Sequence, residues 1–103
     1  MKTYTKSRIE IFIEQPILKR LTDALDRSEA TGYTVLPAIG GKGRGGPWRR
    51  DDAIHSADQM TAVICYTDPA KVDAVTELVF DVMKNRIGIL SISEVEVLRP
   101  ERF

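Results

Sequence analysis

The chain has 103 residues, with fifteen basic and fifteen acidic side chains, so its formal net charge is zero. This length is typical of one domain, and neutrality argues against a protein that coats nucleic acid, which needs a basic excess. The single cysteine, Cys65, excludes an intrachain disulfide. Neither a bilayer-length apolar run nor a signal-like segment after Met1 is visible. We therefore expect a cytoplasmic protein without stable membrane insertion.

The first half of the chain predicts a strand, a helix and a second strand. Residues 8–13 alternate between apolar and other side chains, which is typical of a half-buried strand. Pro16 suits the first turn of a helix, and apolar residues then recur at helical spacing at Ile17, Leu18, Leu21 and Leu25. We expect Gly32 to end this segment and the second strand to run over residues 33–39.

The second half predicts the same kind of unit. Residues 59–66 alternate as a third strand, and Asp68 followed by Pro69 is a helix-start signal. A helix then follows, with an apolar stripe at Val72, Val75, Val79, Val82 and Met83. Gly88 is expected to end the next turn, and residues 90–98 form the last strand. The apolar phase of this strand slips between Ile92 and Val95, which predicts a bulge near Ser93.

The predicted order, β-α-β-β-α-β, indicates an α+β fold of the ferredoxin-like type. Its four-stranded antiparallel sheet carries both helices on one face, because right-handed crossovers leave few other arrangements. The second face of the sheet then has no helix to cover it. Phe12 and its neighbours on that face must meet solvent, a ligand or another subunit.

A glycine-rich run at residues 40–46 is the strongest functional signal in the sequence. Five glycines allow a ligand to approach the backbone closely, and Lys42 and Arg44 add positive charge. An anion, above all a nucleotide phosphate, is the expected ligand. The run opens a connection of roughly nineteen residues, far longer than most in a compact domain. It is followed by Pro47 and Trp48 rather than by a helix, so it is not a dinucleotide-binding motif. A flexible linker with chance basic residues remains an alternative.

Other candidate residues give weaker signals. Trp48 is either an anchor for a partner protein or a side chain folded back on the domain. His55 and Cys65 read as an ordinary loop histidine and a buried filler. Arg99 and Arg102, just after the last strand, could clamp phosphates if the chain end reaches the loop. No catalytic arrangement and no metal-ligand spacing is evident, so we do not expect an enzyme.

Four short segments together resemble the PII signalling proteins. They are Gly32-Tyr33-Thr34-Val35 at the second strand, Gly41-Lys42-Gly43-Arg44 at the base of the long loop, Asn85-Arg86-Ile87-Gly88 before the last strand, and Val97-Leu98-Arg99 after it. The resemblance implies one PII-like domain over residues 1–103, with residues 40–58 as a flexible T-loop-like segment. It also implies a homotrimer that binds adenine nucleotides between subunits and signals through this loop.

The same resemblance assigns expected site residues. Those for the nucleotide are Thr34, Gly41, Lys42, Gly43, Arg44, Ile64, Gly88, Arg99 and Arg102. Bicarbonate would bind at Gly41, Lys42 and Gly43, and the target protein would contact Trp48, Arg49 and Arg50.

Departures from the PII pattern narrow the expected function. Ile89 to Ser91 follow Gly88 where the PII pattern has Asp-Gly-Lys, and residues 40–58 contain no tyrosine for uridylylation. The chain is more similar to the divergent group linked to carboxysomes and inorganic carbon. That likeness implies that ADP or AMP is favoured over ATP, which stays an alternative, and that bicarbonate is a candidate second ligand. The implied target is a bicarbonate transporter or a carboxysome-linked protein.

Three other functions stay open at this point. One is a nitrogen-regulatory PII protein that senses ATP and ADP. A second is a ferredoxin-like RNA-binding module that stacks bases on Phe12 and Tyr66, although the neutral charge speaks against it. The third is an acylphosphatase-like enzyme with an arginine and Asn85, which lies at a helix end and is a weak candidate.

Overall fold

The computed structural model describes residues 1–52 and 59–102. The first unit contains strand β1 (Tyr4–Glu14), the 3-10 turn η1 (Gln15–Ile17), helix α1 (Leu18–Arg27) and strand β2 (Thr34–Pro37). A hairpin of β3 (Gly40–Gly43) and β4 (Gly46–Arg49) follows, and then the 3-10 turn η2 (Arg50–Asp52). The second unit contains strand β5 (Met60–Thr67), the turn η4 (Pro69–Lys71), helix α2 (Val72–Met83), strand β6 (Gly88–Val97) and the turn η5 (Pro100–Arg102).

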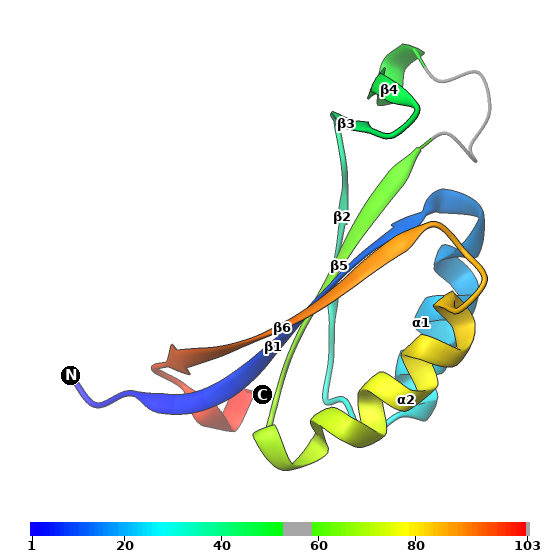
Figure 1. Cartoon of the computed structure of the whole chain (residues 1–103). Helices are drawn as coiled ribbons and strands as arrows, with labels where there is room; N and C mark the ends of the chain where they lie inside the picture. Colours follow the sequence, from blue (N-terminus) through cyan, green and yellow to red (C-terminus); the bar gives the residue numbers. More distant parts are fainter. Residues whose placement is uncertain (53–58, 103) are drawn as a thin grey trace.

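One antiparallel sheet contains four strands in the order β2-β5-β1-β6, and both helices lie on the same face of it (Figure 1). The predicted ferredoxin-like fold is therefore confirmed. Ile9, Ile11 and Ile13 point from the central strand β1 into the layer between sheet and helices, where they are fully buried. The helices contribute Leu21, Leu25, Val75 and Val79 to the same core. Each such side chain contributes about 1.5–3 kcal/mol by leaving water.

The other face of the sheet is uncovered, as the sequence predicts. An apolar row crosses this face through cross-strand neighbours on all four strands: Leu36, Ala62, Phe12 and Ile89. Leu36 is 45% exposed and Ile89 is 65% exposed. Contiguous apolar surface of this kind is typical of a face that another molecule covers.

Helix α1 ends at Arg27, earlier than the expected stop near Gly32. Ser28 leaves the helical conformation, and its hydroxyl donates to the Leu25 carbonyl at 2.7 Å and accepts from the Ala30 N–H at 3.0 Å. A serine hydroxyl thus satisfies the backbone groups at this helix end. The predicted start signal of the second helix is confirmed, because the Asp68 carboxylate accepts from the Ala70 N–H at 3.1 Å.

The predicted bulge near Ser93 is wrong. Strand β6 pairs with β1 without interruption from Tyr4 opposite Val97 to Ile13 opposite Gly88, and Ser93 lies opposite Arg8. The apolar phase slips because β6 is an edge strand with apolar residues on both faces. Leu90 points toward the helices, whereas Ile89 and Val95 point to the uncovered face.

Candidate functional site

The glycine-rich run forms a two-stranded hairpin, β3 paired with β4, which the sequence pattern did not reveal. Gly40 pairs with Arg49 and Gly41 with Trp48, and Gly46 after the turn has a φ of 101°, which glycine adopts without strain. A Cβ on Gly40 would lie 2.7 Å from the Trp48 carbonyl oxygen, and one on Gly41 would lie 3.3 Å from the Trp48 indole nitrogen. The two strands approach closely because these positions lack side chains.

A cavity of about 1290 Å³ lies beneath this hairpin. At this cavity the hairpin lies beside the start of β5 and the turn before β6, two segments that are far from each other in the sequence. The lining outside the hairpin consists of Phe12, Ala38, Met60, Ile87, Gly88 and Ile89. A cavity of this size can hold a nucleotide-sized ligand.

The cavity combines apolar walls with a cationic rim. Lys42 and Arg44 line it from the hairpin and are exposed, and Arg49 lines it while its Nε lies 3.1 Å from Asp51 Oδ1. Among the described residues, no carboxylate lines the cavity itself. The local field therefore favours an anion, although the whole chain is neutral.

Gly88 brings the turn before β6 directly against β1. A Cβ at this position would lie 2.8 Å from the Phe12 carbonyl oxygen and 2.9 Å from Met83 Cε. The first of these atoms belongs to the central strand and cannot move aside. Glycine is thus required for the turn to reach the cavity.

The substitution Gly88→Ala is expected to lower the free energy of unfolding by about 1–3 kcal/mol, because the new methyl group overlaps fixed backbone. Urea unfolding monitored by circular dichroism measures this loss. Gly32→Ala is the matched control, since a Cβ there meets nothing within 4 Å. Equal unfolding midpoints for the two variants would contradict the assignment.

The remaining predicted nucleotide residues lie elsewhere. Thr34 and Ile64 are direct cross-strand partners on the uncovered face. Arg99 and Arg102 follow β6, at the end of the sheet opposite the hairpin (Figure 1). Strand β6 has 10 residues, so its ends are about 30 Å apart. One chain therefore brings Gly41, Lys42, Gly43, Arg44 and Gly88 together, but not the two C-terminal arginines.

The three predicted target contacts differ in their surroundings. Trp48 is half-buried against Gly41 and lines the cavity, and Arg49 is exposed. Arg50 is directed inward: its guanidinium donates hydrogen bonds to the carbonyls of Ala38 and Met60 and to the Gln59 side chain. These bonds give Arg50 a structural role, while its predicted contact with a target remains a prediction.

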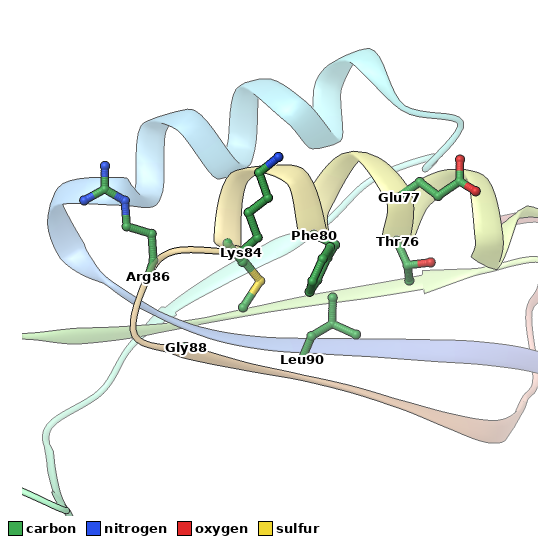
Figure 2. A pocket seen from close by; sticks show the side chains of 8 residues that line it. Thr76, Glu77, Phe80, Lys84, Arg86, Gly88 and Leu90 are labelled. Carbon is green, nitrogen blue, oxygen red and sulfur yellow. The ribbon is translucent and has the colours of Figure 1, made fainter.

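A second, smaller cavity of about 590 Å³ lies between α2 and β6. Figure 2 shows Phe80 of α2 and Leu90 of β6 pointing toward each other, with Lys84 and Arg86 directed away from the sheet. Lys84 Nζ lies 3.0 Å from Asp81 Oδ1, so its charge is paired. Gly88 is the one predicted site residue in its lining, and the first cavity is therefore the better candidate.

Several residues of the first cavity were missed by sequence reasoning. Met60, Ile87 and Ile89 reach it because β5 and β6 begin beside the hairpin, which their local sequence does not reveal. Phe12 was placed on the uncovered face from its alternation with the buried isoleucines of β1, but it was not assigned to this cavity. The Arg50 hydrogen bonds had no usable signal, because their acceptors lie 9 to 12 residues away in sequence.

Other candidates give no second site. Cys65 is buried, and burial raises the pKa of its thiol, so it packs as a filler. His55 lies outside the described residues. Within residues 1–52 and 59–102, no cluster of three potential metal ligands is found. No helix of this part of the chain has the length and apolarity to cross a membrane.

Solved structures of similar fold include CPII, a nitrogen regulatory PII-like protein from Thiomonas intermedia K12. Its complex with ADP, AMP and bicarbonate superposes with a TM-score of 0.84 at 25% identity, over 99% of this chain and 96% of that one. Its complex with ADP and bicarbonate gives 0.81 at 25% identity, over 99% and 97%. Its complex with ADP, AMP and acetate gives 0.79 at 25% identity, over 100% and 98%.

A search of curated proteins found no match. The family model described as nitrogen regulatory protein P-II matches residues 6–102, which is nearly the whole chain. The match covers the sheet, both helices and the hairpin with its cavity. The chain therefore belongs to the P-II family, as one of its divergent PII-like members.

Proposed function

We propose that this protein is a PII-like regulator that binds adenine nucleotides in clefts between the subunits of a homotrimer. ADP and AMP are the favoured ligands, with ATP as an alternative. The observation that carries the proposal is the cavity beneath the β3–β4 hairpin, where Lys42, Arg44 and the Gly88 turn meet apolar walls. The similar CPII structures hold ADP and AMP, which supports the same ligand class here.

A trimer accounts for two features of the single chain. The uncovered apolar row that ends at Leu36 and Ile89 needs a partner surface. A neighbouring subunit can also bring Arg99 and Arg102, with Thr34 and Ile64, to the hairpin of the first subunit. Each cleft then combines a glycine-rich anion site from one chain with bidentate arginine donors from another.

Bicarbonate is the proposed second ligand, at Gly41, Lys42 and Gly43. Backbone N–H groups and an ammonium suit a small planar oxyanion. The similar CPII structures contain bicarbonate or acetate, two anions of this shape.

The hairpin and the chain that follows it are the proposed signalling surface, with Trp48 and Arg49 in contact with the target. The target class is a cytoplasmic or membrane-bound partner in inorganic-carbon metabolism, such as a bicarbonate transporter or a carboxysome-linked protein. The proposed function is regulatory rather than enzymatic: the ligands would be bound without being converted, and a partner protein would detect whether the cavity beneath the hairpin is filled.

Calorimetric titration with AMP, ADP, ATP and bicarbonate, singly and in pairs, tests this function. We expect ADP and AMP to bind, and bicarbonate to raise the affinity for at least one of them. A further titration with 2-oxoglutarate in the presence of Mg-ATP distinguishes the proposed function from nitrogen sensing, which would require 2-oxoglutarate to bind. Indifference to every adenylate would refute the proposal.

A further inference from the structure

Arg50 connects the end of the hairpin to both strands that flank the long connection. It is the first residue of η2, and its backbone N–H donates to the Ile39 carbonyl at 2.7 Å. Its side chain donates from Nε to the Ala38 carbonyl at 2.9 Å, from Nη1 to Gln59 Oε1 at 2.7 Å, and from Nη2 to the Met60 carbonyl at 3.0 Å.

The acceptors of Arg50 mark the point where the chain leaves and re-enters the sheet. Ala38 directly follows β2, Gln59 directly precedes β5, and Met60 is the first residue of β5. The Ala38 N–H also donates to the Met60 carbonyl at 3.1 Å. The guanidinium therefore closes the base of the connection. A planar group with donors on three nitrogens is needed for this geometry, and lysine cannot reproduce it.

The residues held by this closure line the cavity. Ala38 and Met60 form part of its wall, and the hairpin that ends one residue before Arg50 carries Lys42 and Arg44. The hairpin itself is rich in glycine, which has the largest backbone entropy to lose on ordering. A hairpin of this composition therefore needs anchors such as Arg50 to keep one conformation.

We propose that Arg50 is a positioning residue of the ligand site. It fixes the hairpin over the cavity before the ligand arrives, so that Lys42 and Arg44 meet the anion without further ordering. Arg50 acts through the hairpin and does not touch the ligand. This inference rests on the proposed function and adds a pre-organising residue to it.

Trp48 supplies a readout that does not depend on a ligand. It is the only tryptophan of the chain and packs half-buried against Gly41. Quenching of its fluorescence by acrylamide in the ligand-free protein therefore reports whether the hairpin is held in place. Loss of the Arg50 bonds should raise this quenching.

The test compares Arg50→Gln and Arg50→Lys with Arg27→Gln, a matched loss of exposed charge on α1. Both Arg50 variants are expected to show stronger quenching without ligand and about tenfold weaker ADP binding. Their urea midpoints should fall, because three part-buried hydrogen bonds are lost, so both readouts are taken without urea, where circular dichroism shows the protein folded. Gln59→Glu, which keeps the acceptor for Arg50, should leave the quenching as in the wild type.

Three results would overturn the inference. One is unchanged quenching in both Arg50 variants, which would mean that the guanidinium does not hold the hairpin. A second is full ADP affinity in Arg50→Lys, which would mean that charge alone matters. The third is a wild type that binds no adenylate, because the proposed function then fails and the positioning role fails with it. In that case the quenching still shows whether Arg50 anchors the hairpin.

Discussion

Replacing both Lys42 and Arg44 with glutamine is expected to lower the affinity for ADP about 100-fold. Each charge-assisted hydrogen bond contributes about 1.5 kcal/mol or more, and two such bonds multiply to this factor. Both side chains line the cavity from one hairpin, so their loss removes most of the positive field there. Calorimetry at one fixed salt concentration measures the effect, because exposed charges are screened by salt.

The matched control is Arg20→Gln with Arg27→Gln. These arginines are exposed on α1 and do not line the cavity, and the double variant removes the same charge. We expect it to bind ADP like the wild type. A similar loss in both double variants would show that net charge, rather than the hairpin site, governs binding.

Replacing Arg99 with glutamine is expected to weaken ADP binding about tenfold, although Arg99 lies at the far end of the sheet from the hairpin. The reason is that its guanidinium would reach the site of a neighbouring subunit. In this chain its Nε lies 3.9 Å from Glu101 Oε1, and both side chains are largely exposed, so this pair holds it weakly.

Arg86→Gln provides a sharp comparison. Arg86 precedes Gly88 by two residues but lines the smaller cavity beside α2. If the site were complete within one chain, Arg86 would be closer to the ligand and the more damaging loss. If the site is shared between subunits, Arg99→Gln should lose more affinity for ADP than Arg86→Gln in calorimetric titrations of the two variants.

The sequence predicts the architecture well because the relevant signals are local. Alternation in β1 places Ile9, Ile11 and Ile13 on the buried face, and the same alternation leaves Phe12 on the uncovered one. Asp68 begins the second helical segment by accepting a hydrogen bond from the Ala70 N–H, only two residues further along the chain. Fold class and open face both follow from such short-range patterns.

Features that depend on distant contacts escape sequence reasoning. The β3–β4 hairpin forms in a run with little strand propensity. It forms because Gly41, which has no side chain, leaves room for the Trp48 ring on the paired strand. The hydrogen bonds of Arg50 exist only once β2 and β5 lie side by side. The continuous register of β6 likewise depends on its place at the sheet edge.

Mixing two damaged proteins tests the shared site most directly. One carries Lys42→Gln with Arg44→Gln, the other Arg99→Gln with Arg102→Gln, and the two are co-expressed with different tags and purified as mixed trimers. If each site takes its hairpin from one subunit and its arginines from the next, every mixed trimer contains one repaired site, so about one third of the sites regain wild-type affinity for ADP. Recovery of no high-affinity sites in verified mixed trimers would contradict the account.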